Sequence, residues 1–246
     1  MKECELFNRS IYKYFIFNTQ TAPDFYRYGV NNVVAVGHSR LDAYFAPTAK
    51  HNSWKSQNKT HIIYAPHHSF KDSIYKQGTW EWNGEHILEL AKQHQDTTEW
   101  IFKPHPRFKI ELTNLLHSAE KAQAIFDEWG KVATVYTEGN YMDIFKTADL
   151  MISDCCSFKI EWLPTEKPYI ELVSHYPNAD LGDMYRHFCE GYYKARTTED
   201  IDKFFDQIVY QKQDPYKQKR QELLKEIPQQ SSLNIYNHIC QELAQS

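Results

Sequence analysis

The sequence has few of the residues that staple a fold or bind a soft metal. Its 246 residues include five cysteines, at positions 4, 155, 156, 189 and 240, and none forms a C-x-x-C pair. An odd number leaves at least one thiol unpaired, which argues against a disulfide framework. Structural zinc needs four ligands, and no second Cys or His cluster lies at the usual spacing from Cys155 and Cys156. The sequence therefore predicts structural thiols and no metal site.

Long apolar runs, nucleotide-binding glycine motifs and excess positive charge are also missing. No stretch reaches the roughly 18 apolar residues of a membrane-spanning helix, and the opening MKECE does not resemble a secretory signal. The absence of G-x-x-x-x-G-K-[ST] and G-x-G-x-x-G motifs argues against an ATPase or an NAD-dependent dehydrogenase. A formal net charge of -4 argues against a nucleic-acid partner. We expect a globular, cytoplasmic protein.

Short apolar runs alternate with amphipathic stretches, which is typical of alternating strands and helices. The predicted strands are Tyr14–Phe17, Val33–Val36, His61–Ala65, Glu99–Lys103, Val132–Tyr136, Leu150–Ser153 and Tyr169–Val173. The predicted helices are Glu85–His94, Ile110–Trp129, Tyr141–Thr147, Phe158–Leu163, Thr198–Tyr210, Tyr216–Glu226 and Leu233–Leu243, with N-caps at Asn140 and Thr198. Continuously apolar strands indicate an α/β fold whose doubly wound parallel sheet is covered on both faces.

The polar segment Pro47–Thr60 lacks periodicity and is the predicted linker. About five strand-helix units follow it, whereas the two short strands before it are too few for an independent core. We therefore expect residues 1–46 to be a remnant of an N-terminal domain or a hinge segment. Residues 47–246 are expected to form the main domain. Its C-terminal helices either pack on the core, cross back toward the partner domain or lie on a membrane surface.

Unusual polar side chains follow three predicted strands, at the sheet edge where ligands of open α/β sheets bind. The first set is His67 and His68, after the strand at residues 61–65. These imidazoles either meet a phosphate or sugar or close a solvent-facing loop. Because consecutive side chains of an extended backbone point in opposite directions, we expect at most one of them to face a cleft.

The second set lies in FKPHPRFK, residues 102–109. Lys103, His105, Arg107 and Lys109 place four basic side chains within seven residues, and a proline on each side of His105 restricts the backbone. A fixed imidazole with its pKa near neutral pH suits donation to a diphosphate or proton transfer. The alternative is a basic turn over a helix terminus.

The third set lies in DCCSFKIE, residues 154–161. Asp154 ends a predicted strand, and the small residues after it precede a helix that we expect to begin near Phe158. Cys156 and Ser157 then lie at a helix N-terminus, where unpaired N–H groups and the helix dipole favour a bound phosphate. The alternative is an ordinary capped turn.

Two further interpretations concern the same segment. Glu161 lies one helical turn beyond Ser157, where it is placed to accept hydrogen bonds from ribose or sugar hydroxyls. A Ser-His-Asp hydrolase can also be assembled from Ser157, His105 and Asp154. The sequence around Ser157 lacks the G-x-S-x-G elbow of such enzymes, which argues against it.

Four segments together resemble the CDP-glycerol glycerophosphotransferase family. In order they are VVAVGHSRLDAYF (33–45), IIYAPHHSF (62–70), WIFKPHPRFK (100–109) and YMDIFKTADLMISDCCSFKIEWLPTEKPYIEL (141–172). These enzymes build teichoic-acid and capsule polymers with a GT-B fold, in which two Rossmann-like domains face each other across a cleft. The resemblance implies that residues 47–246 are the Rossmann-like nucleotide-binding domain, the C-terminal half of a GT-B fold.

The resemblance also implies roles for single residues. His105 matches the catalytic histidine of the family's K-x-H-P motif, which contacts the diphosphate and stabilises the departing CDP. Asp154 and Ser157 match a phosphate-binding turn, and Arg40 and Asp42 match a G-x-x-R-x-D stretch with a structural or cleft-edge role. The expected nucleotide- and phosphate-binding residues are Lys103, Arg107, Asp154, Cys156, Ser157, Glu161, His67 and Arg40. No metal or other cofactor is implied, because these groups offset the leaving-group charge.

The sequence departs from the family in three places. His38-Ser39 replaces an aromatic-proline pair before Arg40, and His67-His68 replace a Thr-Trp pair. The family's N-terminal domain should precede Tyr14, where few residues are available, and its Trp-His-Gly motif supplies the expected acceptor base. The chain therefore resembles the nucleotide-binding half, as a natural truncation, an engineered fragment or one partner of a split enzyme.

These features lead us to expect a transferase. It would move glycerophosphate, or a related polyol-phosphate or sugar unit, from CDP-glycerol or another nucleotide-activated donor. The expected acceptor is a polymer or lipid-linked molecule such as teichoic acid or capsule. The alternatives are a non-catalytic nucleotide-binding module, half of a split enzyme, and a nucleotide-sugar epimerase-like enzyme. Peripheral contact with the inner face of the plasma membrane is left open.

Overall fold

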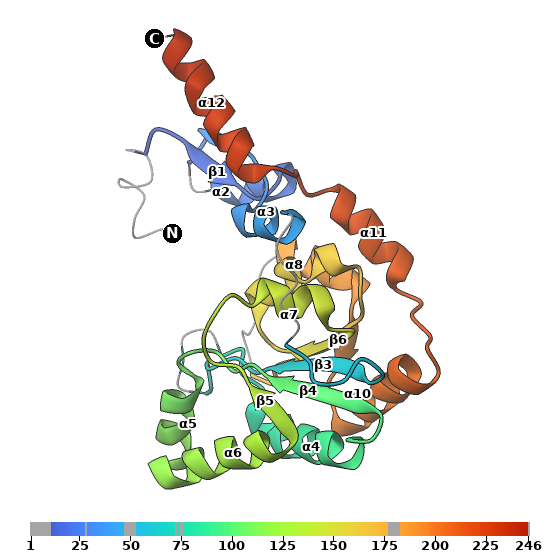
Figure 1. Cartoon of the computed structure of the whole chain (residues 1–246). Helices are drawn as coiled ribbons and strands as arrows, with labels where there is room; N and C mark the ends of the chain where they lie inside the picture. Colours follow the sequence, from blue (N-terminus) through green and yellow to red (C-terminus); the bar gives the residue numbers. More distant parts are fainter. Residues whose placement is uncertain are drawn as a thin grey trace. The chain divides into compact units, whose positions relative to one another are not determined.

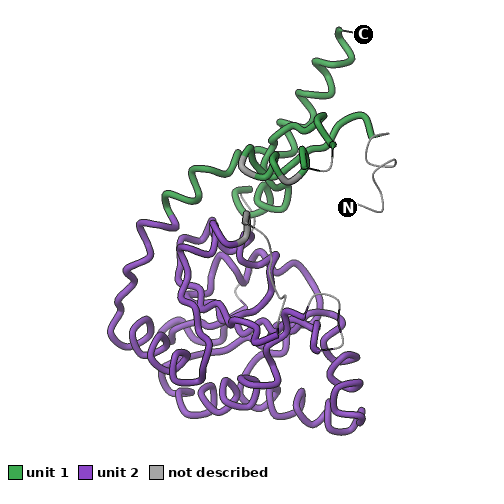
Figure 2. Tube along the Cα trace, turned by 180° about the vertical axis from the view of Figure 1, so that it is seen from behind, with its two compact units in different colours: residues 1–49, 221–246 green, residues 50–220 purple. Residues whose placement is uncertain are grey.

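The computed structural model describes residues 11–27, 29–46, 53–71, 73, 76–176 and 183–245. Residues 47–52 of the predicted linker Pro47–Thr60 lie outside these ranges. The chain divides into two compact units, which Figure 2 distinguishes by colour: unit 1, residues 1–49 and 221–246, and unit 2, residues 50–220. Each unit is described by itself.

Unit 2 contains a six-stranded parallel sheet. In chain order its strands are β3 (Thr60–Ala65), β4 (Thr98–Phe102), β5 (Ala133–Val135), β6 (Leu150–Ser153), β7 (Tyr169–Leu172) and β8 (Tyr193–Ala195). Across the sheet the order is β5-β4-β3-β6-β7-β8, and every neighbouring pair is parallel. The chain starts in the middle, winds to one edge, returns, and winds to the other edge. This is the doubly wound Rossmann-like order, so the predicted fold class is confirmed.

Helices cover both faces of this sheet. They are α4 (Trp80–Gln93), α5 (Phe108–Leu116), α6 (Ala119–Val132), α7 (Met142–Thr147), α8 (Cys156–Glu161), α9 (Asp183–Phe188) and α10 (Thr198–Phe205), and α11 (Lys217–Lys225) spans the boundary between the units. Figure 1 shows α7 and α8 on one face and α4 and α6 on the other. All four residues of β6 are buried, as expected of a central strand covered on both sides.

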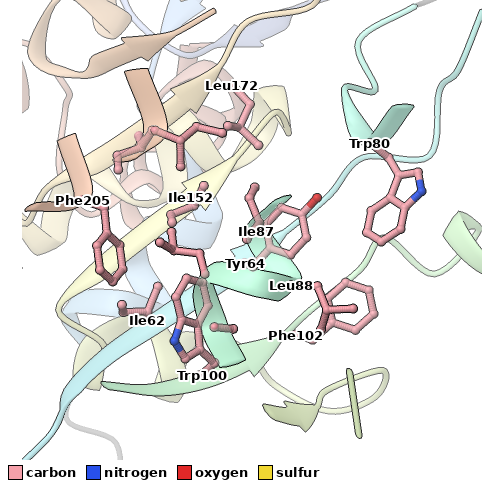
Figure 3. Packing of buried hydrophobic residues seen from close by; sticks show 14 of the residues in the cluster. Ile62, Tyr64, Trp80, Ile87, Leu88, Trp100, Phe102, Ile152, Leu172 and Phe205 are labelled. Atoms are coloured by element: carbon pink, nitrogen blue, oxygen red, sulfur yellow. The ribbon is translucent and has the colours of Figure 1, made fainter. Parts of the chain in front are cut away.

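An aromatic core fills the face beneath α4 and α6. Tyr64 of β3 and Trp100 and Phe102 of β4 are at most 1% exposed, and Figure 3 shows them clustered. Trp129 of α6 stacks on Phe102 with ring centroids 4.6 Å apart, and Phe205 of α10 stacks on Trp100 at 6.1 Å. Burial of these large rings is the main stabilising contribution to the unit, and it fixes the strands whose ends carry the polar loops.

The structure differs from the predicted elements at a few points. All seven predicted strands are present, but β8 was missed because it is three residues long and carries an exposed Lys194. The single helix predicted over Ile110–Trp129 is two helices, α5 and α6. His117 interrupts them with a left-handed φ of 50°, and Ser118 starts α6 by accepting a hydrogen bond from the Lys121 N–H.

The predicted N-caps are each shifted by one residue. Thr197, rather than Thr198, caps α10 in a reciprocal capping box with Asp200. Asn140 accepts a hydrogen bond from the Met142 N–H, one residue before the cap position at Tyr141. These shifts leave the predicted helices in place.

Unit 1 contains two short parallel strands. β1 (Tyr14–Ile16) pairs with β2 (Val33–Ala35). A 3-10 turn at Thr19–Thr21 and the helices α2 (Ala22–Tyr26), α3 (Ser39–Phe45) and α12 (Ser231–Gln245) complete the unit. Gly37 has a φ of +96°, and a Cβ there would lie 2.2 Å from the Pro228 carbonyl oxygen, so this position requires glycine.

The C-terminal segment groups differently from our expectation. Residues 221–246 belong to unit 1, whereas we expected them to belong with residues 47–220. The physical reason is local bonding: the Asp42 carboxylate accepts hydrogen bonds from the Ser231 and Ser232 N–H groups, and Asn234 donates to the Val36 carbonyl. Helix α12 therefore packs within unit 1, together with the N-terminal segment.

Helix α12 also leaves apolar side chains at the surface of unit 1. Leu233, Tyr236, Ile239 and Leu243 are 45–71% exposed. In the described part of the chain, no helix is both long enough and apolar enough to cross a membrane. Peripheral membrane contact stays a prediction.

Candidate functional site

The carboxyl ends of β3 and β6 mark the point where the winding of the sheet reverses. β3 leads to Pro66, the neighbouring β4 leads to Lys103, and β6 leads to Asp154. Main-chain hydrogen bonds join the first two loops, because the His105 N–H donates to the Pro66 carbonyl at 3.1 Å and the Lys103 N–H to the Tyr64 carbonyl at 2.8 Å. Ligands of doubly wound sheets bind at this crevice. The three loops singled out from the sequence therefore meet at one edge.

Asp154 joins two of the surrounding segments. It is 2% exposed; one carboxylate oxygen accepts from the His67 N–H at 2.6 Å, and the other accepts from the Thr79 N–H and hydroxyl at 2.7 and 2.8 Å. Burial raises the pKa of Asp154, while these hydrogen bonds oppose the rise. The carboxylate thus organises the loop after β3 and the start of α4. This differs from the direct phosphate contact that we expected.

His67, His68 and His105 form what we call the histidine cluster. The ring centroids of His68 and His105 are 4.0 Å apart with planes 23° apart, and His67 lies 4.4 Å from His68 and 5.3 Å from His105. His67 is 8% exposed and the other two are half-buried. The two side chains do not point in opposite directions as expected, because the chain bends at His68 instead of continuing extended. Which of them faces a cleft stays a prediction.

The cluster is electrically neutral at neutral pH. Burial, followed by the imidazoles of His68 and His105, lowers the pKa of His67 to about 3. Burial, followed by His68, Lys103 and Arg107, lowers the pKa of His105 to about 4. The near-neutral pKa expected for His105 therefore does not hold for the protein without its ligand.

The two predicted cations beside the cluster have different surroundings. Lys103 is 9% exposed, and its ammonium lies 4.6 Å from the centroid of the Tyr141 ring and 5.1 Å from that of Phe158. This cation–π enclosure holds the charge at the sheet edge. Arg107 donates to Glu111 of its own helix at 2.5 Å, with 64% of the Arg107 side chain exposed. Both phosphate contacts stay predictions, and Lys103 has the more enclosed position.

The turn after β6 begins its helix earlier than we expected. Helix α8 starts at Cys156, and Cys155 is the N-cap, with its N–H bonded to the Ser153 hydroxyl at 3.0 Å. Burial raises the pKa of Cys155 to about 11, so its thiol is protonated at neutral pH and is no thiolate nucleophile. Cys156 and Ser157 are half-buried in the first turn of this six-residue helix, and their phosphate contact stays a prediction.

Two carboxylates, one buried and one half-buried, lie on or beside α8. Glu161 is 2% exposed and accepts a hydrogen bond from the Tyr141 hydroxyl at 2.6 Å; its contact with ribose stays a prediction. Lys159, 3% exposed, donates to Glu171 of β7 at 2.6 Å. The second carboxylate oxygen of Glu171 is buried without a hydrogen-bond partner among the described residues. The sequence had indicated only the first of these acids.

Some residues of the site carried no sequence signal that we recognised. Thr79 holds Asp154 across 75 positions of the chain, and no local pattern marks it. His68 was not among the expected binding residues, because strand periodicity allowed only one of the two histidines to face the cleft, yet it stacks on His105. Tyr141 lies within the longest of the four motifs. The available signal was its aromatic ring at the first residue of the helix predicted over Tyr141–Thr147.

Arg40 and Asp42 belong to unit 1. Arg40 is exposed at the start of α3, where its N–H donates to Nδ1 of His38 at 3.3 Å. Although burial opposes the shift, hydrogen bonds from Ser232 and Ser231 lower the pKa of Asp42. Asp42, like Gly37, holds the C-terminal segment of unit 1. The nucleotide contact expected of Arg40 stays a prediction.

A doubly wound parallel sheet with loops converging at its switch point defines a Rossmann-like α/β domain of the kind found in GT-B glycosyltransferases. The family model of the CDP-glycerol:poly(glycerophosphate) glycerophosphotransferases matches residues 10–241, and the chain belongs to that family. A search of curated proteins found no match.

Solved structures share the fold at low sequence identity. The wall teichoic acid polymerase TagF aligns with a TM-score of 0.63 and 15% identity, over 99% of this chain and 62% of that one. The co-structure of S. aureus MnaA with UDP aligns with a TM-score of 0.63 and 12% identity, over 98% and 63%. The UDP-GlcNAc 2-epimerase from Methanocaldococcus jannaschii gives 0.55 and 16%, over 86% and 60%. This chain spans less than two thirds of the length of each.

Proposed function

We propose that this chain acts in the transfer of glycerophosphate, or of a related polyol-phosphate or sugar unit, from a CDP-activated donor to a cell-surface polymer such as teichoic acid or capsule. Family membership supports the reaction class. The observation that carries the proposal is the place of His105. It follows β4, its N–H is bonded to the Pro66 carbonyl after β3, and its ring stacks on His68.

The chemistry of the transfer determines the leaving group. An acceptor hydroxyl attacks the β-phosphorus of CDP-glycerol, the bond from that phosphorus to the bridging oxygen breaks, and the nucleotide leaves as CMP. The resemblance of the K-x-H-P motif had implied CDP as the leaving group. CDP leaves only when the transferred unit carries no phosphate. Negative charge grows on the bridging oxygen, and N–H donors or cations near it lower the barrier. His105, Lys103 and the first turn of α8 are the groups we assign to this role.

The test is a transfer assay with labelled CDP-glycerol and a poly(glycerophosphate) acceptor, following CMP release and labelled polymer. His105→Ala is expected to reduce the rate about 10²- to 10⁴-fold, because a positioned proton donor is lost. His86→Gln is the matched control, since His86 pairs with Asp202 at 2.7 Å on α4 and α10. An unchanged rate in His105→Ala would contradict the assignment.

A second candidate is a nucleotide-binding module that is not a catalyst by itself. The convergence of the loops after β3, β4 and β6 at one sheet edge supports nucleotide binding without showing turnover. Calorimetry with CDP, CDP-glycerol and UDP separates the two: binding without CMP release supports the module, and no binding to any nucleotide rejects both. Product analysis of UDP-GlcNAc without acceptor tests the epimerase alternative.

A further inference from the structure

We propose that unit 2 binds an aliphatic polyamine in a groove between α4 and the segment that runs from α10 to Tyr210. The groove has a volume of about 310 Å³. It lies apart from the loops of the candidate site. Helix α4 begins beside Thr79, which holds Asp154, whereas the groove follows the second half of α4. The inference therefore goes beyond the proposed function and does not depend on it.

Two hydrogen bonds close the ends of the groove. At one end Nε2 of His86 bonds to the Asp202 carboxylate at 2.7 Å, and at the other Nδ1 of His94 bonds to the Tyr210 hydroxyl at 2.5 Å. The two bonds are eight positions apart on each side. On α4 this separation corresponds to a length of about 12 Å, at the rise of an α-helix. An extended triamine such as spermidine spans a similar length.

The floor of the groove is apolar. Leu90 of α4 and Phe205 of α10 line it and are 6% and 2% exposed. The Phe205 ring lies 5.0 Å from the His94 ring and 6.1 Å from the Tyr210 ring, and Tyr210 is 44% exposed. A methylene chain on this floor replaces water that otherwise meets apolar atoms, and the exposed aromatic face also attracts a cation.

The walls of the groove are acidic. Glu89 stands on α4, and Asp202 and Asp206 stand on the opposite side, while no lysine or arginine of the described chain lines the groove. Lys92 donates to Glu89 at 2.8 Å, and the Gln211 amide donates to Asp206 at 2.5 Å. Within the described residues each of these bonds uses one carboxylate oxygen, which leaves the second oxygen for an ammonium group.

The acids are spread along the groove and do not converge on one point. In the part of the chain that the structure describes, the histidine cluster is the one group of three metal-ligand side chains whose ligand atoms lie within 4.8 Å of one another. A divalent ion bound by protein needs several oxygen ligands at one point. Amino groups that are separated by methylenes match separated carboxylates on an apolar floor.

The main chain at the groove is unusual. Asp206–Tyr210 is π-helical, and the Gln211 N–H donates to the Asp206 carbonyl five residues earlier at 3.0 Å. Turns of this kind are rare in globular proteins and occur frequently at functional sites. Here the turn carries Asp206 of one wall and Tyr210 of one end, so it shapes the groove itself.

Calorimetry with spermidine in about 0.1 M NaCl tests the proposal, because this salt concentration screens weak attraction between distant charges. We expect one site with a Kd below about 1 mM. n-Butylamine carries a single amino group, so it should bind about fivefold more weakly through the loss of a second ion pair.

A pair of double variants separates the groove from the net charge of the protein. Glu89→Gln with Asp206→Asn keeps an acceptor oxygen for Lys92 and Gln211 but removes both charges, and should weaken spermidine binding about tenfold. Glu120→Gln with Asp127→Asn, on the exposed surface of α6, changes the net charge equally and should stay within about twofold of wild type. Urea unfolding checks that both variants are folded.

Five outcomes decide the matter. A loss confined to the groove variant supports the proposal. Equal losses in the two double variants overturn it, in favour of attraction to net charge. Equal affinity for n-butylamine and spermidine overturns the polyamine assignment, and so does displacement of spermidine by an equal concentration of MgCl₂. Absence of binding up to about 10 mM spermidine also overturns it. The proposed function, which concerns the loops at the carboxyl ends of the strands, stands or falls separately.

Discussion

The β6–α8 turn and the histidine cluster lie at the same edge of the sheet, but they use their polar groups differently. In the turn, both oxygens of Asp154 accept hydrogen bonds from the protein, and the thiol of Cys155 is buried and protonated. In the cluster, Nδ1 of His67 and of His105 accepts a hydrogen bond from a backbone N–H, so each neutral ring carries its hydrogen on Nε2. Buried polar groups are normally hydrogen-bonded, so the difference separates groups that hold the loops from groups that meet a ligand.

The largest expected effect comes from removing the Asp154 carboxylate in the β6–α8 turn. Asp154→Ala leaves three buried donors, the N–H groups of His67 and Thr79 and the Thr79 hydroxyl, without their acceptor. We expect the free energy of unfolding to fall by about 3–5 kcal/mol, as when one partner of a buried charged network is removed. Urea unfolding measures it.

Two companion variants sharpen the result. Asp154→Asn keeps the shape and one acceptor oxygen, and should cost about 1–3 kcal/mol. Asp127→Ala on α6 removes an exposed carboxylate and should change the stability by less than about 0.5 kcal/mol. If Asp154→Ala unfolds at the same urea concentration as Asp127→Ala, Asp154 does not organise these loops.

The histidine cluster makes the free energy of unfolding depend on pH. The pKa of His67 is about 3 in the folded protein and 6.5 when the residue is unperturbed. Between these pH values the unfolded chain binds more protons at His67 than the folded protein does. The contribution of His67 to the free energy of unfolding is therefore fully present above pH 6.5 and is lost as the pH falls. From about pH 7 to about pH 5, His67 alone should remove about 2 kcal/mol from the free energy of unfolding.

His67→Gln isolates this contribution because glutamine does not titrate. The wild type and the variant should differ in their loss of stability between the two pH values by about 2 kcal/mol, measured by urea unfolding at each. Parallel losses in the two proteins would mean that His67 is not held neutral by its surroundings.

The sequence predicted the fold well because the signal for parallel strands is local. Continuous apolar runs such as those of β3 and β6 follow directly from burial on both faces. β8 was missed because three residues with an exposed Lys194 give no run to detect. The break between α5 and α6 depends on the left-handed conformation of His117, which is uncommon for residues other than glycine and which helical periodicity does not reveal.

The candidate site was predicted only in part, for a related reason. The K-x-H-P segment is marked by its own prolines and cations, so His105 was recognised locally. The role of Asp154 depends on Thr79, and the fixed tautomer of His67 depends on a bend at His68. Strand periodicity continued past Pro66 gives the wrong direction for His68. Such contacts arise from the folded arrangement of distant segments, and no short pattern encodes them.

The smallest expected effect concerns the adjacent cysteines of the turn. Cys155 is the N-cap of α8 but makes no side-chain capping bond within the described residues, and serine is among the preferred N-cap residues. The double variant Cys155→Ser, Cys156→Ser should therefore keep the free energy of unfolding within about 1 kcal/mol. CDP-glycerol affinity, measured by calorimetry, should stay within about twofold of wild type, since the first turn of α8 offers the ligand its backbone N–H groups, which both substitutions keep. A loss beyond tenfold would place a thiol in contact with the ligand, and the two regions would then share the same role.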